Sequence, residues 1–145
     1  MSFNATNGNI SSAPIYAAKG WRVIPIRPEG KIPLVNDWPG AATTDTRTIK
    51  RWWRKWPKAN VGVACGPESG IFVLDVDLKN GKNGENSLKA LERKHGKLPE
   101  TREHRTPTGG RHLFFKCDNS VEVTNKASFA EGLDVRADRG LLAAA

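Results

Sequence analysis

The sequence predicts an α/β (α+β) domain built around a mixed β-sheet. Strand-like and helix-like stretches alternate over the first two thirds of the chain, and antiparallel strands with short links follow. The composition agrees, because 145 residues with 38% hydrophobic and 26% charged side chains suffice for one folded domain with a core.

The N-terminal part of the chain is expected to start with an arm and to continue with short elements. Residues 1–11, rich in Asn, Ser and Gly, are predicted to be a flexible arm, and residues 12–145 the folded domain. Within that domain, a short helix is expected over residues 12–19 and a strand over residues 21–26. A loop is expected over residues 31–40.

A helix is predicted next, with Thr44 or Asp45 as its N-cap and an end before Pro57. Its apolar residues recur at i, i+3, i+4 and i+7 and so share one face: Ile49, Trp52, Trp53 and Trp56. Basic residues occupy much of the opposite face: Lys50, Arg51, Arg54 and Lys55. Interleaved aromatic and basic side chains can bind DNA. The alternative is that the tryptophans are core residues and the basic face is only solvated.

The stretch 72–78 predicts a strand, because apolar residues alternate with Val73, Asp75 and Asp77. Side chains alternate with period two, so both aspartates lie on one face, about 7 Å apart. Fixed carboxylates repel each other unless a cation lies between them, and Mg²⁺ prefers oxygen ligands. Two such ions form the usual clamp for nucleotidyl transfer. A polar strand face that binds nothing is the alternative.

The remaining elements follow from turn signals. A short strand is expected over residues 61–65, and a helix begins at Asn86 or Ser87 and ends at Gly96. Two strands around the turn 107–110 predict a β-hairpin. Two more strands are expected, over residues 132–136 and 141–145.

The charge points to a polyanionic partner. A formal net charge of +8 favours nucleic acid over an anionic membrane. No apolar run approaches the ~20 residues of a membrane span, and the N-terminus lacks a secretory signal. Two cysteines are expected to be reduced thiols. Together these features predict a cytoplasmic protein with no membrane partner.

Three features together resemble the parts of a nucleotidyl transferase. The carboxylate pair is the first, and His112, just after the turn with Gly109 and Gly110, is the second. The third is Asp134, with Arg136 two residues on. His112 and Arg136 can bind phosphate oxygens, and the glycines allow close approach of the backbone to a ligand.

The order and the local sequences of these segments resemble those of the bifunctional DNA primase/polymerase N-terminal domain, the Prim-Pol branch of the archaeo-eukaryotic primase superfamily. The resemblance covers about residue 13 onward. The segments that carry it include Tyr16-Ala-Ala-Lys-Gly-Trp-Arg-Val-Ile-Pro25, Gly70-Ile-Phe-Val-Leu-Asp-Val-Asp77, Gly109-Gly-Arg-His112 and Gly132-Leu-Asp-Val-Arg136.

The resemblance implies a fold and a site. The fold is an α/β unit joined to an RNA-recognition-motif-like sheet, with the active site in the cleft between them. Three metal ligands are implied: Asp75, Asp77 and Asp134. Another residue set is implied to bind the nucleotide: His112 at the triphosphate with Gly110 ahead of it, and Arg136 and Lys31 at phosphates or template.

The implied activity is template-directed DNA primase/polymerase chemistry by a two-metal mechanism with Mg²⁺ or Mn²⁺. Expected partners are a single-stranded DNA template or primer–template, dNTP or NTP substrates, and a helicase domain or protein. Such modules occur in plasmid, phage or prophage replication proteins. The alternatives are a metal-dependent nuclease or phosphoesterase, and a non-catalytic basic DNA-binding module.

The last segment departs from the family pattern. After Asp-Val-Arg the family usually continues Gly-x-Gly-Gly-Tyr and then Pro-Pro-Ser, whereas here residues 137–145 read Ala-Asp-Arg-Gly-Leu-Leu-Ala-Ala-Ala. The domain is therefore expected to be truncated at its C-terminus.

Overall fold

The computed structural model describes residues 8–28, 30–117, 123–137 and 140–143. Its helices are α1 (Gly8–Ala18), α2 (Trp38–Ala41), α3 (Thr46–Lys55) and α4 (Gly84–His95), with a 3₁₀ turn η1 (Lys79–Gly81). Its strands are β1 (Val23–Ile26), β2 (Asn60–Ala64), β3 (Ile71–Val76), β4 (Arg102–Arg105), β5 (Arg111–Lys116), β6 (Lys126–Ala130), β7 (Leu133–Arg136) and β8 (Leu141–Ala143).

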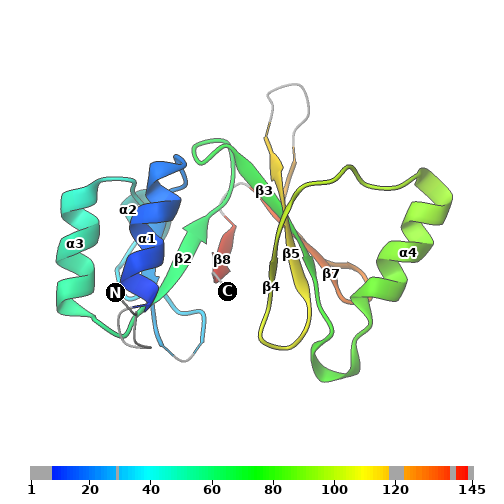
Figure 1. Ribbon diagram of the computed structural model, residues 1–145, viewed down its shortest axis with the longest axis horizontal. Helices are drawn as coiled ribbons and strands as arrows, with labels where there is room; N and C mark the ends of the chain where they lie inside the picture. Colours follow the sequence, from blue (N-terminus) through cyan, green and yellow to red (C-terminus); the bar gives the residue numbers. More distant parts are fainter. Residues whose placement is uncertain (1–7, 29, 118–122, 138–139, 144–145) are drawn as a thin grey trace.

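The α+β class is confirmed, but the strands form two sheets that are each antiparallel rather than one mixed sheet (Figure 1). The smaller sheet has the order β1-β2-β8, and the larger has the order β4-β5-β3-β7-β6. The two strands that flank α4 in the sequence do not pair with each other, because β5 lies between β3 and β4. The connection from β3 through α4 to β4 therefore passes over β5, which follows β4 in the sequence.

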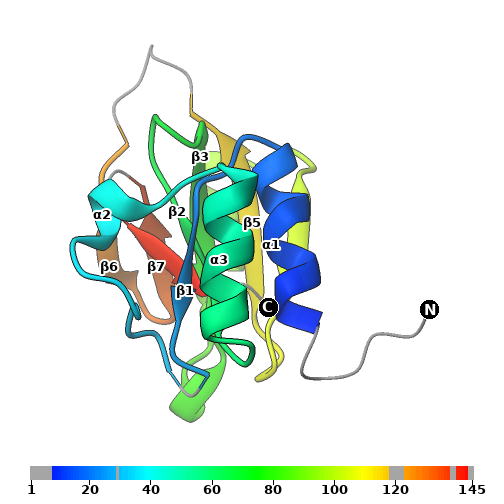
Figure 2. The same cartoon turned by 90° about the vertical axis from the view of Figure 1, so that its left-hand side faces the viewer.

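The N-terminal half consists of α1, α3 and the smaller sheet, to which β8 from the other end of the chain is added as an edge strand. The two helices cover this sheet and lie side by side in Figure 2. The amphipathic pattern places Ile49 and Trp53 of α3 in the core, and the Trp53 indole donates to the carbonyl of Ala59 at 3.0 Å. The helix starts at the predicted cap, because the Asp45 carboxylate accepts from the backbone N–H of Thr48 at 3.0 Å.

The C-terminal half is the larger sheet, with α4 packed on one face (Figure 1). Alternation along β3 puts Leu74 and Val76 on that face, where they pack with Leu88 of α4 and Leu113 and Leu133. The sheet order places β3 and β5 between β4 and β7, with a helix between β3 and β4. This arrangement fits the predicted RNA-recognition-motif-like half.

Several boundaries differ from the sequence predictions. Helix α1 begins at Gly8, so residues 8–11 of the predicted arm are helical, and residues 1–7 lie outside the described part. A short helix, α2, ends the predicted loop. Helix α4 begins at Gly84, because the side chain of Asn83 accepts from the N–H of Asn86 and caps it early. The strand β6 was not predicted.

Two further findings concern partners and compartments. None of the helices in the described part is long and apolar enough to cross a membrane. Both cysteines are free thiols, and burial raises the pKa of Cys65 to about 12. Such a thiol stays protonated and unreactive at neutral pH.

Candidate active site

A cavity of about 470 Å³ lies where the two halves meet, at the C-terminal end of β3. The smaller sheet contributes its last strand to one wall, and the turn between β4 and β5 contributes to another. The lining residues are Lys31, Asn60, Asp75, Asp77, Lys79, Thr106, Pro107, Thr108, His112, Arg136 and Leu141–Ala143. Acidic, basic and apolar side chains therefore line the same cavity.

Four polar residues form one row across the larger sheet. Asp75 of β3 is the direct partner of His112 on β5 and of Asp134 on β7. His104 of β4 is in turn the partner of His112. Residues in direct register share a face of the sheet, so all four side chains lie on the face turned away from α4. The antiparallel pairing thus brings together residues far apart in the sequence.

Asp75 is largely buried, with 14% of its side chain exposed. Burial raises the pKa of Asp75, and the neighbouring carboxylates of Asp134 and Asp77 act in the same direction, against the cations Lys31 and Arg136. A buried carboxylate that must be charged needs a positive partner. The site therefore favours the arrival of a cation beside Asp75.

His112 is a neutral imidazole in this environment. Burial, followed by the nearby charges of Lys31, His104 and Arg136, lowers the pKa of His112 to about 4. Its Nε2 lies 3.6 Å from the Asp75 carboxylate, and its buried Nδ1 has no hydrogen-bond partner among the described residues. An unpartnered nitrogen is less costly as a lone pair than as an N–H. The proton is then on Nε2, the nitrogen that faces Asp75.

The other two predicted carboxylates are held differently. Asp77 follows the end of β3, and one of its oxygens accepts from the N–H of Lys79 at 2.8 Å. Asp134 accepts from the N–H of Ser128 at 2.6 Å and lies 3.4 Å from the Arg136 guanidinium. Asp134 is beside Asp75 but does not line the cavity. The structure thus brings Asp75 and Asp77 to the cavity and leaves Asp134 bound to β6 and β7.

The carboxylates fit a hard divalent cation only in part. Their oxygen chemistry suits Mg²⁺ or Mn²⁺, and the unfavourable burial of Asp75 would be relieved by such an ion. Among the residues that the structure describes, however, no three acidic, His or Cys side chains converge as a complete ligand set. Metal binding by Asp75, Asp77 and Asp134 together therefore stays a prediction.

The predicted phosphate-binding residues are mostly present. Lys31 and Arg136 both line the cavity. Gly110 is buried, and a Cβ there would overlap the carbonyl oxygen of Val76, so only glycine lets β5 start this close to β3. Its role in the described structure is close packing of the two strands that carry Asp75 and His112.

Sequence reasoning missed part of the lining. Lys79, Thr106 and Thr108 lie at the cavity because the start of η1 and the β4–β5 turn both reach it. The signal available was their position, directly after Asp77 and inside the turn before His112. In contrast, the predicted DNA-binding residues of α3 are exposed on the N-terminal half and do not line the cavity: Lys50, Arg51, Arg54 and Lys55.

Comparison with known proteins identifies a family for the chain. The family model described as "Bifunctional DNA primase/polymerase, N-terminal" (Prim-Pol) matches residues 13–145. No curated protein matches the chain. The family match spans nearly all of the sequence, including every residue placed at the cavity.

Proposed function

Since the chain belongs to the Prim-Pol family of DNA primase/polymerase-type nucleotidyl transferases, we propose that it catalyses template-directed nucleotide addition at the cavity between its two sheets. The observation that carries the proposal is the juxtaposition of Asp75, Asp77 and His112 with the cations Lys31 and Arg136 around one cavity. A nucleoside triphosphate needs both sets. Carboxylates hold the metal ions that bind some of its phosphate oxygens, and cationic side chains bind the other oxygens directly.

In this reaction a 3′-hydroxyl oxygen forms a bond to the α-phosphorus of the incoming nucleotide. The bond between the α-phosphorus and the bridging oxygen breaks, pyrophosphate leaves, and the hydroxyl proton is released. Divalent ions, when bound, neutralise the charge that develops and lower the pKa of the hydroxyl. Asp75 and Asp77 would hold them, and Asp134 is the proposed third ligand.

The chain's other residues then bind and orient the nucleotide. Lys31, Lys79 and Arg136 supply positive charge to the triphosphate, and Arg136 can bind two oxygens at once. The neutral His112 donates from Nε2 to a phosphate oxygen, which requires no proton uptake at neutral pH. Leu141 and Leu142 give the cavity an apolar surface that displaces water.

We further propose that Mg²⁺ or Mn²⁺ is the cofactor and that the DNA template, the primer and dNTP or NTP substrates are the partners. The placement of the module in a plasmid, phage or prophage replication protein, with a helicase as partner, rests on the family alone. All these finer assignments require that the protein adds nucleotides to DNA.

The test is nucleotide incorporation on primed and unprimed single-stranded DNA with Mg²⁺ or Mn²⁺. The Asp75→Asn/Asp77→Asn double variant should lose extension, whereas Asp37→Asn, which removes a charge from an exposed residue outside the cavity, should retain it. Products on the unprimed template would add primase activity.

Two outcomes would replace this proposal. Degradation of labelled DNA with metal but without nucleotides would favour the nuclease or phosphoesterase. DNA binding without extension, unaffected by Asp75→Ala, would favour the non-catalytic binding module.

A further inference from the structure

Strand β8 has a free edge at the candidate active site. It pairs with β2 at the end of the order β1-β2-β8, and no other described strand pairs with it. Figure 1 shows it between β2 and the strands of the larger sheet. Its three residues, Leu141, Leu142 and Ala143, all line the cavity at Asp75. The smaller sheet therefore meets this cavity with its last strand.

The side chains of β8 pack on the two faces of the smaller sheet, because successive residues of a strand point to opposite faces. Leu142 is 3% exposed and belongs to the core cluster that contains residues of α1 and α3. Leu141 packs with the cluster on the other face, where its Cδ1 lies over Gly62. Consecutive residues with opposite side chains line the same cavity because the cavity meets the strand at its edge. Backbone groups are therefore part of what β8 presents to a ligand.

The backbone hydrogen bonds of β2 alternate between its two neighbours. The N–H of Ala64 donates to the carbonyl of Arg22, on the β1 side, at 2.9 Å. The next N–H, that of Cys65, donates to the carbonyl of Gly140, on the β8 side, at 2.8 Å. Such alternation is the rule in antiparallel pairing, since successive residues turn their N–H and C=O groups in opposite directions. The preceding residue of β2 that bonds to β8 is therefore Val63.

The same alternation gives the direction of the backbone groups of β8. Leu142 is the direct partner of Val63, so its N–H and C=O turn toward β2. Its neighbours Leu141 and Ala143 turn theirs the other way, and no backbone hydrogen bond of the described residues uses the N–H of either one. Two N–H donors and two C=O acceptors thus lie along the free edge, with about 7 Å between the two residues.

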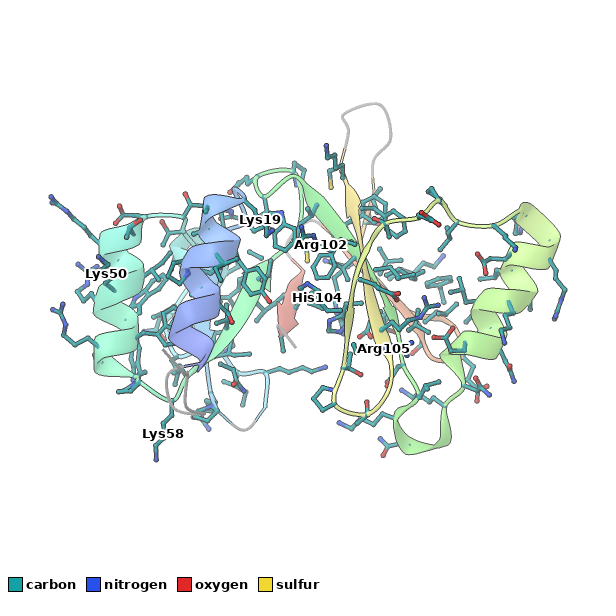
Figure 3. All side chains as sticks on the ribbon, viewed as in Figure 1. Lys19, Lys50, Lys58, Arg102, His104 and Arg105 are labelled. Atoms are coloured by element: carbon teal, nitrogen blue, oxygen red, sulfur yellow. The ribbon has the colours of Figure 1, made fainter. Side chains whose placement is uncertain are left out.

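The polar row of the larger sheet lines the same cavity. His104 of that row lies against Tyr16 of α1, with ring centres 6.2 Å apart, so the row is turned toward the N-terminal half. Figure 3 shows His104 pointing from β4 toward α1. Asp75 and His112 share this face and line the cavity together with β8. A ligand held at Asp75 and His112 therefore shares its cavity with the free edge of β8.

The three parts of a nucleotide differ in what they offer such an edge. The triphosphate is an anion that the β8 carbonyls would repel and that Lys31 and Arg136 attract. The base needs its pairing edge for the template. A sugar hydroxyl both donates and accepts a hydrogen bond, so it complements an N–H beside a C=O. When a ligand displaces water from the cavity, backbone groups left without a partner weaken its binding.

We propose that the free edge of β8 binds the sugar hydroxyls of the incoming nucleotide through the backbone N–H and C=O groups of Leu141 and Ala143. The assignment rests on the proposed function, because it takes the ligand of the cavity to be a nucleoside triphosphate. Backbone groups are present whatever the side chains are. The departure of residues 137–145 from the family pattern therefore does not remove this contact.

The first test removes the hydroxyls from the ligand. Equilibrium dialysis of the full chain with Mg²⁺ and without DNA measures its affinity for ATP, dATP, 2′,3′-dideoxy-ATP and inorganic triphosphate. ATP and dATP should each bind at least about fivefold more tightly than the dideoxynucleotide, which leaves desolvated backbone groups unpaired. Equal affinity for dATP and the dideoxynucleotide would overturn the proposal.

The second test removes one donor from the protein. Proline has no N–H, and a strand edge tolerates it where the N–H faces outward. Ala143→Pro should therefore retain the wild-type melting temperature, whereas Leu142→Pro, which removes an N–H bonded to β2, should lower it. Ala143→Pro should also at least halve the preference for dATP over the dideoxynucleotide and leave the affinity for inorganic triphosphate unchanged. An unchanged preference, or equal losses of melting temperature in both variants, would overturn the assignment.

Amide hydrogen exchange, followed by NMR, examines the same groups in the wild type and so does not depend on how a proline variant folds. Saturating dATP should slow exchange at Leu141 and Ala143 at least about tenfold relative to saturating inorganic triphosphate. Leu142, already bonded to β2, should exchange slowly with either ligand. Equal exchange at Leu141 and Ala143 with the two ligands would contradict sugar binding at this edge.

The outcomes separate this proposal from the proposed function. None of the three measurements needs a template or a chemical step. A chain that shows the sugar preference but never extends a primer therefore contradicts the polymerase assignment alone. A chain that extends primers but binds dATP and the dideoxynucleotide equally contradicts the β8 assignment alone.

Discussion

Asp75 is the residue at which stability and the proposed activity conflict. Its raised pKa means that the folded chain holds this proton more tightly than the unfolded chain does. The contribution of Asp75 to the free energy of unfolding therefore falls as the pH rises through its unfolded pKa toward its higher folded pKa. At neutral pH the charged form is a cost that a bound cation would remove.

The first prediction follows for Asp75→Asn. The rate of nucleotide incorporation by the variant should fall at least about 100-fold. This is more than is usual for a change to a residue that only hydrogen-bonds a metal ligand. Its melting temperature at pH 7 without metal should equal or exceed that of the wild type, because the buried charge is gone. Thermal unfolding and primer extension measure the two effects, with Asp37→Asn as the control. A variant that unfolds more easily and still extends primers would contradict both parts.

The second prediction concerns His112. The unfolded chain takes up a proton on this residue below about pH 6.5, whereas the folded chain resists until about pH 4. The free energy of unfolding should therefore fall by about 2–3 kcal/mol from this residue as the pH drops through that window. Lys31, Arg136, Asp75 and Asp77 line the same cavity and His104 is the strand partner of His112, so the wild type alone does not isolate the effect.

The difference between the wild type and His112→Gln does isolate it. Denaturant unfolding in EDTA at pH 7, 6, 5 and 4 should show a difference that shrinks steadily toward low pH. A constant difference across the series would show that His112 takes up its proton as readily in the folded protein as in the unfolded chain, so that its pKa is not lowered by folding.

At the scale of the elements, the junction of β3 and β5 leaves no room for a side chain at Gly110. The third prediction is that Gly110→Ala lowers the free energy of unfolding by about 1–3 kcal/mol, because the new Cβ would overlap the Val76 carbonyl and push the strands apart. Chemical denaturation measures this loss. Thr108→Ala, in the same turn but exposed, should have little effect. Equal stability of the two variants would remove the packing role given to Gly110.

The sequence allowed those elements to be predicted whose signals are local. Helix α3 was located by its cap and its 3.6-residue period, and the β4–β5 hairpin by its glycine turn. Strand β6 was missed because its residues are almost all exposed and its pairing with β7 contains an irregularity, so no alternation marks it. The site followed the same rule. The Asp75–Asp77 pair is local, whereas the contact of Asp134 with Ser128 depends on a left-handed backbone at Ser128.

At the scale of the whole molecule, the candidate site exists only because the two halves meet. The fourth prediction is that Mn²⁺ or Mg²⁺ raises the melting temperature of the wild type, since an ion that binds only the folded state stabilises it. The shift should disappear in the Asp75→Asn/Asp77→Asn variant and should persist in Asp37→Asn. An equal shift in all three proteins would place the ions elsewhere on the chain.

The pairing of β8 has a consequence for how this protein is made. Among the described strands β8 is the last to leave the ribosome, yet it pairs with β2 of the first half and supplies the apolar wall at Leu141 and Leu142. Until it emerges, β2 keeps one edge without a neighbour, while the larger sheet already has all its strands. Closure of the small sheet and closure of the cavity at Asp75 are therefore one step, which waits for β8. A nascent chain stalled before Gly140 could fold much of its structure and still have no walled site to offer a nucleotide.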